Sequence, residues 1–107
     1  MGWAFLLLAG ALEVGFTTTL RMLIKTPNNI LLNALFVVLV IASFTCLQQA
    51  VRTVPLGTGY AVWTGIGAVG TVIVGGVFFG ESLPPLRLAL IGLIIVSVVG
   101  LKLIDAH

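Results

Sequence analysis

Charged side chains are scarce in this sequence. Asp, Glu, Lys and Arg together make up 7% of its 107 residues, whereas 60% of the residues are hydrophobic. A soluble domain is typically about 25% charged, because polar groups must cover its surface. A chain with so few charges and a mean hydropathy of +1.28 cannot be covered in that way. We therefore expect lipid to be its solvent.

Cysteine, histidine and clustered charge are also nearly absent, and each absence excludes a class of function. Cys46 is the only cysteine, so no disulfide can form within the chain. His107 is the only histidine, and no Ser/His/Asp or metal-ligand cluster occurs, so we expect neither an enzyme nor a cofactor or metal. The five basic residues are scattered singly and leave a net charge of +2, which predicts no nucleic-acid partner.

Four long apolar runs dominate what the sequence does contain. A helix needs about 20 residues to cross the hydrocarbon of a bilayer, and backbone polar groups in lipid must all be paired. The alternation of polar and apolar residues that a β-barrel requires is absent. No basic segment precedes the first run, so no cleavable signal peptide is expected. The sequence predicts an all-α membrane protein, a single domain over residues 1–107, with transmembrane helices at about 2–22, 30–51, 57–80 and 85–104.

The connections between these runs are short, so neighbouring helices are expected to be antiparallel. Four short helices cannot easily enclose a path for a solute, and we therefore expect a dimer or larger assembly with the site between subunits. Three basic residues lie toward one membrane side and two toward the other, which is almost no positive-inside bias. One interpretation is dual topology, in which copies of the chain insert in both orientations and pair antiparallel. The alternative is that a partner or the translocon fixes one orientation.

Glu13 is the one acidic residue of the first apolar run. An acidic side chain near the middle of a bilayer costs roughly 2.5–3.5 kcal/mol to insert, and such groups typically carry protons or hold a cation. Gly10 and Thr17 share its helical face. We predict that Glu13 exchanges a proton for a cation, that Gly10 allows close approach, and that Thr17 hydrogen-bonds the carboxyl group or a ligand. The alternative is a protonated Glu13 held in a helix interface.

Tyr60, Trp63 and Gly67 fall on one face of the third predicted helix. Aromatic rings attract cations, and Trp does so best. Together with an acid on the first helix, this face predicts a cation site. The alternative is an aromatic belt at the membrane boundary, which fits Tyr60 partly and Trp63 poorly, because Trp63 lies nearly two turns inside its span.

Glycine is frequent in the same helix. The spacing Gly-x-Gly-x-x-Gly at 65–70 matches the dinucleotide-binding fingerprint, but no strand precedes it, so no nucleotide is expected. In a membrane helix, glycines indicate close packing or a kink. We predict a hinge formed by Gly65, Gly67, Gly75 and Gly76.

The fourth helix has small residues at i, i+4 and i+8, namely Gly92, Val96 and Gly100. Small residues at this spacing allow helices to pack tightly, so this stripe is predicted to be the dimerisation element. Lipid-facing packing is the alternative, because the middle residue is Val.

Ser43 and Arg21 are two other polar residues of the apolar runs. Ser43 either donates a hydrogen bond to Glu13 or, as mid-helix serines more often do, to the carbonyl four residues earlier. Arg21 is too far along the helix to reach Glu13 directly, so we expect it to extend to the membrane boundary.

Specific motifs accompany the four runs. They are Glu13 in the first helix, Gly-Thr-Gly-Tyr-Ala-Val-Trp-Thr-Gly at 57–65 and Phe-Gly-Glu at 79–81. With them the chain resembles the small multidrug resistance family over its full length. The resemblance implies an antiparallel dual-topology dimer, either a homodimer or a heterodimer with a paralogue, in the inner membrane of a bacterium. It also implies export of a cation in exchange for protons by alternating access.

By position, the resemblance also implies roles for individual residues. Glu13 of both subunits would bind protons or substrate in competition, Tyr60 and Trp63 would line the site, Ser43 would belong to the hydrogen-bond network of the carboxylate, and Gly10 to the site wall. Trp-Thr-Gly-Ile-Gly-Ala at 63–68 is similar to the guanidinium-exporter branch. A guanidinium ion is a planar fork that suits bidentate pairing with a carboxylate.

The first helix departs from that branch. Phe16 stands where a Trp helps to shape a narrow site, and the threonines at 17–19 are similar to the quaternary ammonium branch. Three hypotheses follow: an exporter of guanidinium or a substituted guanidinium such as guanylurea, a promiscuous exporter of quaternary ammonium and other lipophilic cations, or a subunit that must assemble with a paralogue.

Overall fold

Helices account for nearly all of the chain in the computed structural model, which describes residues 2–105. Within this part, four helices follow one another, and each is long and apolar enough to cross a membrane. The predicted all-α class is therefore confirmed. The helices are α1 (Gly2–Lys25), α2 (Ile30–Ala50), α3 (Leu56–Phe78) and α4 (Pro85–Asp105).

The helix ends follow local side-chain chemistry. α1 continues to Lys25 rather than ending near residue 22, and Pro27 lies just beyond its end, where proline disfavours further helix. Asn29 caps α2, because its side-chain oxygen accepts a hydrogen bond from the backbone N–H of Leu32 at 3.1 Å. α3 ends at Phe78 rather than near residue 80. Gly80 turns the chain there with a φ of 67°, a left-handed conformation that glycine adopts without strain.

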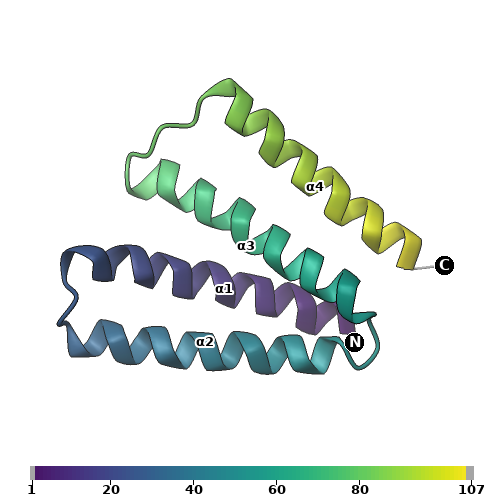
Figure 1. The fold of residues 1–107 in the computed structure, drawn as a ribbon, viewed down its shortest axis with the longest axis horizontal. Helices are drawn as coiled ribbons and strands as arrows, with labels where there is room; N and C mark the ends of the chain where they lie inside the picture. The colour runs from purple at the N-terminus through teal and green to yellow at the C-terminus, as the bar shows by residue number, and fades with distance from the viewer. Residues whose placement is uncertain (1, 106–107) are drawn as a thin grey trace.

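The four helices lie side by side in a single layer (Figure 1). α1 packs between α2 and α3, and α4 packs on the far side of α3. The Cα atoms span 47 × 34 × 16 Å, so the layer is less than half as thick as it is wide. One copy of this single layer does not surround a solute.

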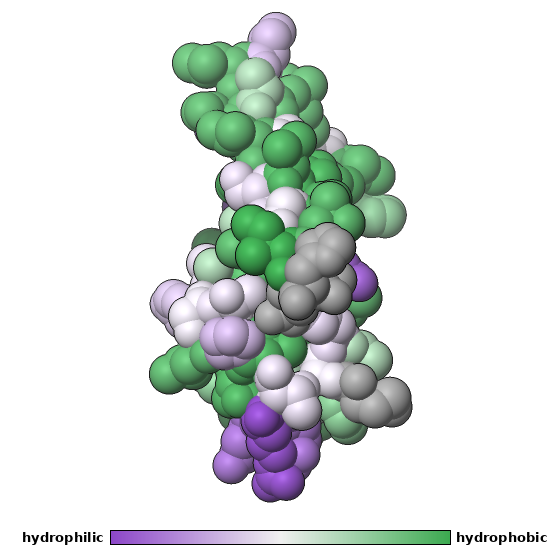
Figure 2. Space-filling view, turned by 90° about the vertical axis from the view of Figure 1, so that its right-hand side faces the viewer, coloured by the Kyte–Doolittle hydropathy of each residue, from purple (hydrophilic) through white to green (hydrophobic). Residues whose placement is uncertain are grey.

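The packed core lies where α1, α3 and the end of α2 meet. Its buried side chains include Leu6 and Ala9 of α1, Ala50 and Val54 around the end of α2, and Val62 and Trp63 of α3. Large apolar side chains outside this core are exposed along all four helices. Seen end-on in Figure 2, hydrophobic residues cover the upper part of the molecule, and hydrophilic residues gather at its lower edge, the side where α2 lies. An outer surface of this kind suits acyl chains rather than water.

Candidate functional site

Glu13 lies on the face of α1 that packs against α3, and Gly67 of α3 makes room for it. A side-chain carbon at position 67 would overlap the carboxyl group of Glu13. Oε1 of this carboxyl group is buried and accepts no hydrogen bond from any described residue. A buried polar atom without a partner is rare, because leaving it unpaired costs roughly 1–3 kcal/mol. The unpaired oxygen is therefore the strongest indication in this structure of a place for a ligand or a proton.

Gly10 and Thr17 face α3 as well, so the three residues lie on one face of α1. Gly10 is packed rather than open, because a Cβ there would lie 2.5 Å from Cγ2 of Ile66. Oγ1 of Thr17 lies 2.6 Å from Oγ1 of Thr71 on α3 and 3.0 Å from the backbone oxygen of Glu13. Thr17 thus bonds to α3 and to the backbone of α1 rather than to the carboxyl group of Glu13. Thr71 was not identified from the sequence.

Ser43 is fully buried and connects three helices. Its hydroxyl donates to the backbone oxygen of Ala9 on α1 at 2.7 Å, and it accepts a hydrogen bond from Nε1 of Trp63 on α3 at 3.0 Å. Neither of the two partners expected from the sequence, Glu13 and the carbonyl four residues earlier, receives its proton. In the sequence, Ser43 stands out only as a hydroxyl in an apolar run, and this pattern does not identify its hydrogen-bond partners.

The aromatic residues of α3 differ in exposure. Trp63 is only 7% exposed and packs against Phe44 of α2, with ring centroids 5.0 Å apart. Tyr60 is 59% exposed, and its ring centroid lies 6.0 Å from that of Trp63. The two rings therefore form a pair that is held on one side by α2 and open on the side of Tyr60. Phe16 packs edge-to-face on Phe36 of α2 with centroids 6.0 Å apart, so its ring faces α2.

Comparison with known proteins decides the family. The sequence model of the small multidrug resistance protein family matches residues 1–94. The chain belongs to the small multidrug resistance family. It is 47% identical to a protein of Citrobacter freundii, over 96% of this chain and 97% of that protein. Identity to a protein of Escherichia coli K12 is 45% over the same shares, and identity to one of Salmonella typhimurium LT2 is 44% over the whole of both chains.

Each of these three relatives is named guanidinium exporter, a name that describes transport rather than catalysis. The predicted family is therefore confirmed. Membership in the small multidrug resistance family, the bacterial relatives and the four long apolar helices together make the chain a multi-pass membrane protein of bacterial type.

The four glycines predicted to form a hinge lie in an α3 that is continuous from Leu56 to Phe78. Gly65 faces α4, because a Cβ there would lie 3.0 Å from Cγ2 of Val98. Gly75 lies under the carboxyl group of Glu81, and Gly76 under the side chain of Leu83, both from the connection to α4. Gly67 alone among these four lies against Glu13. Each glycine therefore also has a packing role.

The α4 stripe of this small multidrug resistance protein is open. A Cβ added at Gly92 or Gly100 would meet no described atom within 4 Å, and Val96 is 67% exposed. α4 packs mainly on α3, and Lys102 near its end also lies over the ring of Trp3 of α1, 5.5 Å from the ring centroid. No other described residue therefore covers this face of α4. Both the predicted dimerisation surface and the alternative, a lipid-facing surface, agree with this.

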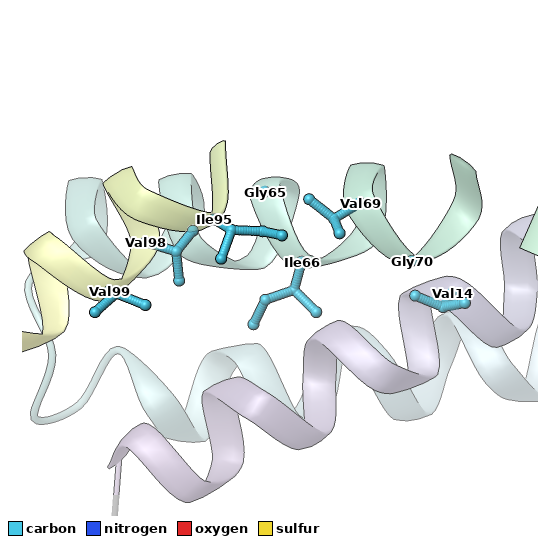
Figure 3. Close-up of a pocket in the computed structure, with 8 residues that line it drawn as sticks. All are labelled: Val14, Gly65, Ile66, Val69, Gly70, Ile95, Val98 and Val99. Atoms are coloured by element: carbon cyan, nitrogen blue, oxygen red, sulfur yellow. The ribbon is translucent and has the colours of Figure 1, made fainter. Parts of the chain in front are cut away.

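An apolar crevice lies beside the α1–α3 contact. It has a volume of about 280 Å³ and lies between α3, α4 and Val14 of α1 (Figure 3). All of its lining residues are apolar or glycine: Val14, Gly65, Ile66, Val69, Gly70, Ile95, Val98 and Val99. Glu13 does not line it. The crevice offers no polar group to bind a charged substrate, so the candidate site is the side of α1 and α3 that carries Glu13 and Trp63.

Arg21 lies one turn before the end of α1. Its Nε lies 3.7 Å from Oε2 of Glu81, and its guanidinium lies over the ring of Phe79 at 5.2 Å from the centroid. Sequence reasoning expected Arg21 only to extend to the boundary. The Phe-Gly-Glu motif at 79–81 was noted from the sequence, but its contact with Arg21 was not.

Proposed function

We propose that this protein exports guanidinium-type cations, guanidinium itself or a substituted guanidinium, in exchange for protons. The observation that carries the proposal is the buried carboxyl oxygen of Glu13, which has no hydrogen-bond partner among the described residues although it lies in a membrane-spanning helix. A protonated carboxyl group needs an acceptor or a small polar neighbour, and an ionised one needs a donor or a cation. Alternate occupation by a proton and by a cation meets both needs.

The surroundings of Glu13 support a guanidinium ion as the cargo. Its N–H groups can bond both oxygens of one carboxylate in parallel, and its flat face can stack on an aromatic ring. Tyr60 and Trp63 provide such rings beside the α1–α3 contact. The relatives at 44–47% identity carry the name guanidinium exporter, which favours the same cargo.

The single-layer shape supports assembly from two copies. One chain forms a single layer of helices and leaves Tyr60 exposed, so a second layer is needed to close a site around Glu13. We propose a homodimer whose copies have opposite orientations in the membrane and contact each other through the stripe at Gly92, Val96 and Gly100. The near-equal distribution of basic residues over the two membrane sides agrees with this arrangement.

Alternating access requires a part of the layer that can bend. Gly65, Gly67, Gly75 and Gly76 leave α3 without side-chain bulk at four positions, one of them against Glu13. We propose that α3 bends at these glycines as the site opens to one side and then the other. Ser43 is proposed to hold Trp63 in position at the site rather than to contact the carboxyl group itself.

The experiment is guanidinium uptake into proteoliposomes driven by a pH gradient. The wild-type chain, purified alone, is expected to transport guanidinium against its gradient, and Glu13→Gln is expected to reduce transport to the level of empty liposomes. Glu81→Gln is the matched control, because it removes a carboxylate of the same size whose contact with Arg21 is partly exposed. Undiminished transport by Glu13→Gln would refute the proposal, and no transport by the purified wild-type chain would favour a heterodimer with a paralogue.

Export of quaternary ammonium ions is the second candidate. The exposed ring of Tyr60 beside Trp63 favours it, since aromatic faces bind such cations. The threonines that suggested it from the sequence are engaged within the protein: Thr18 and Thr19 donate to backbone oxygens of their own helix. Growth assays with guanidinium and with hydrophobic quaternary ammonium salts separate the two, because resistance to guanidinium alone excludes the second candidate.

A further inference from the structure

A second cavity lies at the end of α1, away from Glu13. It has a volume of about 340 Å³ and is open to the outside. Arg21 and Lys25 form one side of it, and as residues i and i+4 they share a face of α1. Thr26 and Asn29, from the connection between α1 and α2, add polar groups to its rim. The cavity therefore combines two cationic side chains with hydrogen-bonding groups at a helix end.

The charge of this cavity is positive. No Asp or Glu lines it. Arg21 shares its charge with Glu81 at 3.7 Å, which is the one ion pair among the described side chains. Lys25 therefore has no carboxylate partner within the described part of the chain. A cationic amine of this kind is available to an anion that enters the cavity.

The remaining wall is apolar. Met22 of α1, Leu32 of α2 and Phe79 beyond α3 complete the lining. Lys25 is the last residue of a membrane-spanning helix, so the cavity lies where the hydrocarbon meets the headgroup layer. A ligand that fits must be anionic at one end and apolar at the other. Inorganic phosphate satisfies only the first condition, whereas an anionic phospholipid satisfies both.

We propose that this cavity binds the headgroup of an anionic phospholipid. Lys25 and Arg21 contact the phosphate, and the side-chain amide of Asn29 donates a hydrogen bond to one of its oxygens. The Thr26 hydroxyl donates to the backbone oxygen of Met22 and accepts a hydrogen bond from a headgroup hydroxyl. Met22 and Leu32 contact the first part of an acyl chain. Basic side chains near a helix end attract anionic lipids in general, but here two of them converge on a hollow with an apolar wall, which favours one bound lipid over diffuse attraction.

The experiment measures lipid binding to the purified protein in a neutral detergent by native mass spectrometry, with phosphatidylglycerol and phosphatidylcholine as probes. A melting curve with inorganic phosphate at the same concentration forms a third arm. Phosphatidylglycerol is expected to bind in preference to phosphatidylcholine, and phosphate is expected to leave the melting temperature unchanged. Lys25→Gln should weaken phosphatidylglycerol binding by about fivefold, given about 1 kcal/mol for one basic residue near an anionic headgroup.

Arg52→Gln is the matched control, because it removes one positive charge at the opposite end of α2. It should leave the preference for phosphatidylglycerol intact, whereas the charge reversal Lys25→Glu should abolish it. Lys25 has no described side-chain partner, so both of its variants should fold. Equal weakening by Lys25→Gln and Arg52→Gln would overturn the proposal in favour of diffuse attraction. Stabilisation by inorganic phosphate alone, or equal binding of both lipids, would overturn it as well.

Discussion

Ser43 and Glu13 are two of the polar residues in the membrane-spanning helices of this protein, and their surroundings are opposite. The hydroxyl of Ser43 is fully buried and has both a donor and an acceptor, Trp63 and the backbone of Ala9. The carboxyl group of Glu13 is partly buried, and one of its oxygens has no partner among the described residues. A satisfied polar group stabilises one arrangement of helices. An unsatisfied one is stable only if something else occupies its site, which is why Glu13 rather than Ser43 is proposed to bind the cargo.

Among substitutions that keep the carboxyl group of Glu13, the largest effect is expected from Gly67→Ala, which fills the space beside it. The added Cβ overlaps the carboxyl group of Glu13, a flexible side-chain end that can move aside. The fold should therefore persist while the carboxyl group is displaced from its place. A hydrogen bond to a charged group contributes about 1.5–3 kcal/mol, so guanidinium binding should weaken by about tenfold to a hundredfold. Isothermal titration of detergent-solubilised protein measures this affinity.

The control for this variant is Gly57→Ala on the same helix. A Cβ at position 57 would meet no described atom within 4 Å, so the same substitution should leave guanidinium affinity unchanged there. A Gly67→Ala protein that binds as tightly as the wild type would show that the contact between Gly67 and Glu13 does not shape the site.

The pH dependence of binding tests whether the unpaired oxygen accepts the proton that competes with the cargo. The cation requires the ionised carboxylate, so a proton bound at low pH must leave before the cation binds. Apparent guanidinium affinity should therefore fall as pH is lowered, by at most about tenfold for each pH unit because one proton is exchanged. Titrations between about pH 9 and pH 6 measure the slope. An affinity that stays constant across this range would contradict competition at Glu13.

Much of the fold and part of the site could be predicted from the sequence, for identifiable physical reasons. Hydropathy and run length depend on composition alone, so the four helices and Glu13 as the intramembrane acid could be read directly. The rotation of each helix about its axis depends on contacts between residues far apart in the chain. For this reason Gly67 was placed on the face of the cation site and in a hinge, but its contact with the carboxyl group of Glu13 was not predicted. Ser43 was given the wrong partners, and Thr71 was missed.

The helix ends show the same limit on a smaller scale. Pro27 lies just beyond the end of α1, and this could have been read from the sequence, because proline has a fixed local effect. The end of α3 at Phe78 depends on how the following turn packs back, with the side chains of Glu81 and Leu83 lying over Gly75 and Gly76. The ion pair between Arg21 of α1 and Glu81 of the α3–α4 connection joins residues that are far apart in the chain. No local sequence pattern therefore predicts it.

The smallest effect is expected from Ser43→Ala, which removes the satisfied hydroxyl but leaves the carboxyl group of Glu13 in place. Two hydrogen bonds between helices are lost, and such bonds in membrane proteins average about 0.6 kcal/mol each, so the free energy of unfolding should fall by about 1 kcal/mol. Thr45→Ala on the same helix is the control, because Thr45 bonds only the backbone oxygen of Ile41 in its own helix. Reversible unfolding in mixed micelles measures both. If Ser43→Ala abolished transport at unchanged stability, Ser43 would act at the site directly, and the contrast between a structural and a functional polar group would fail.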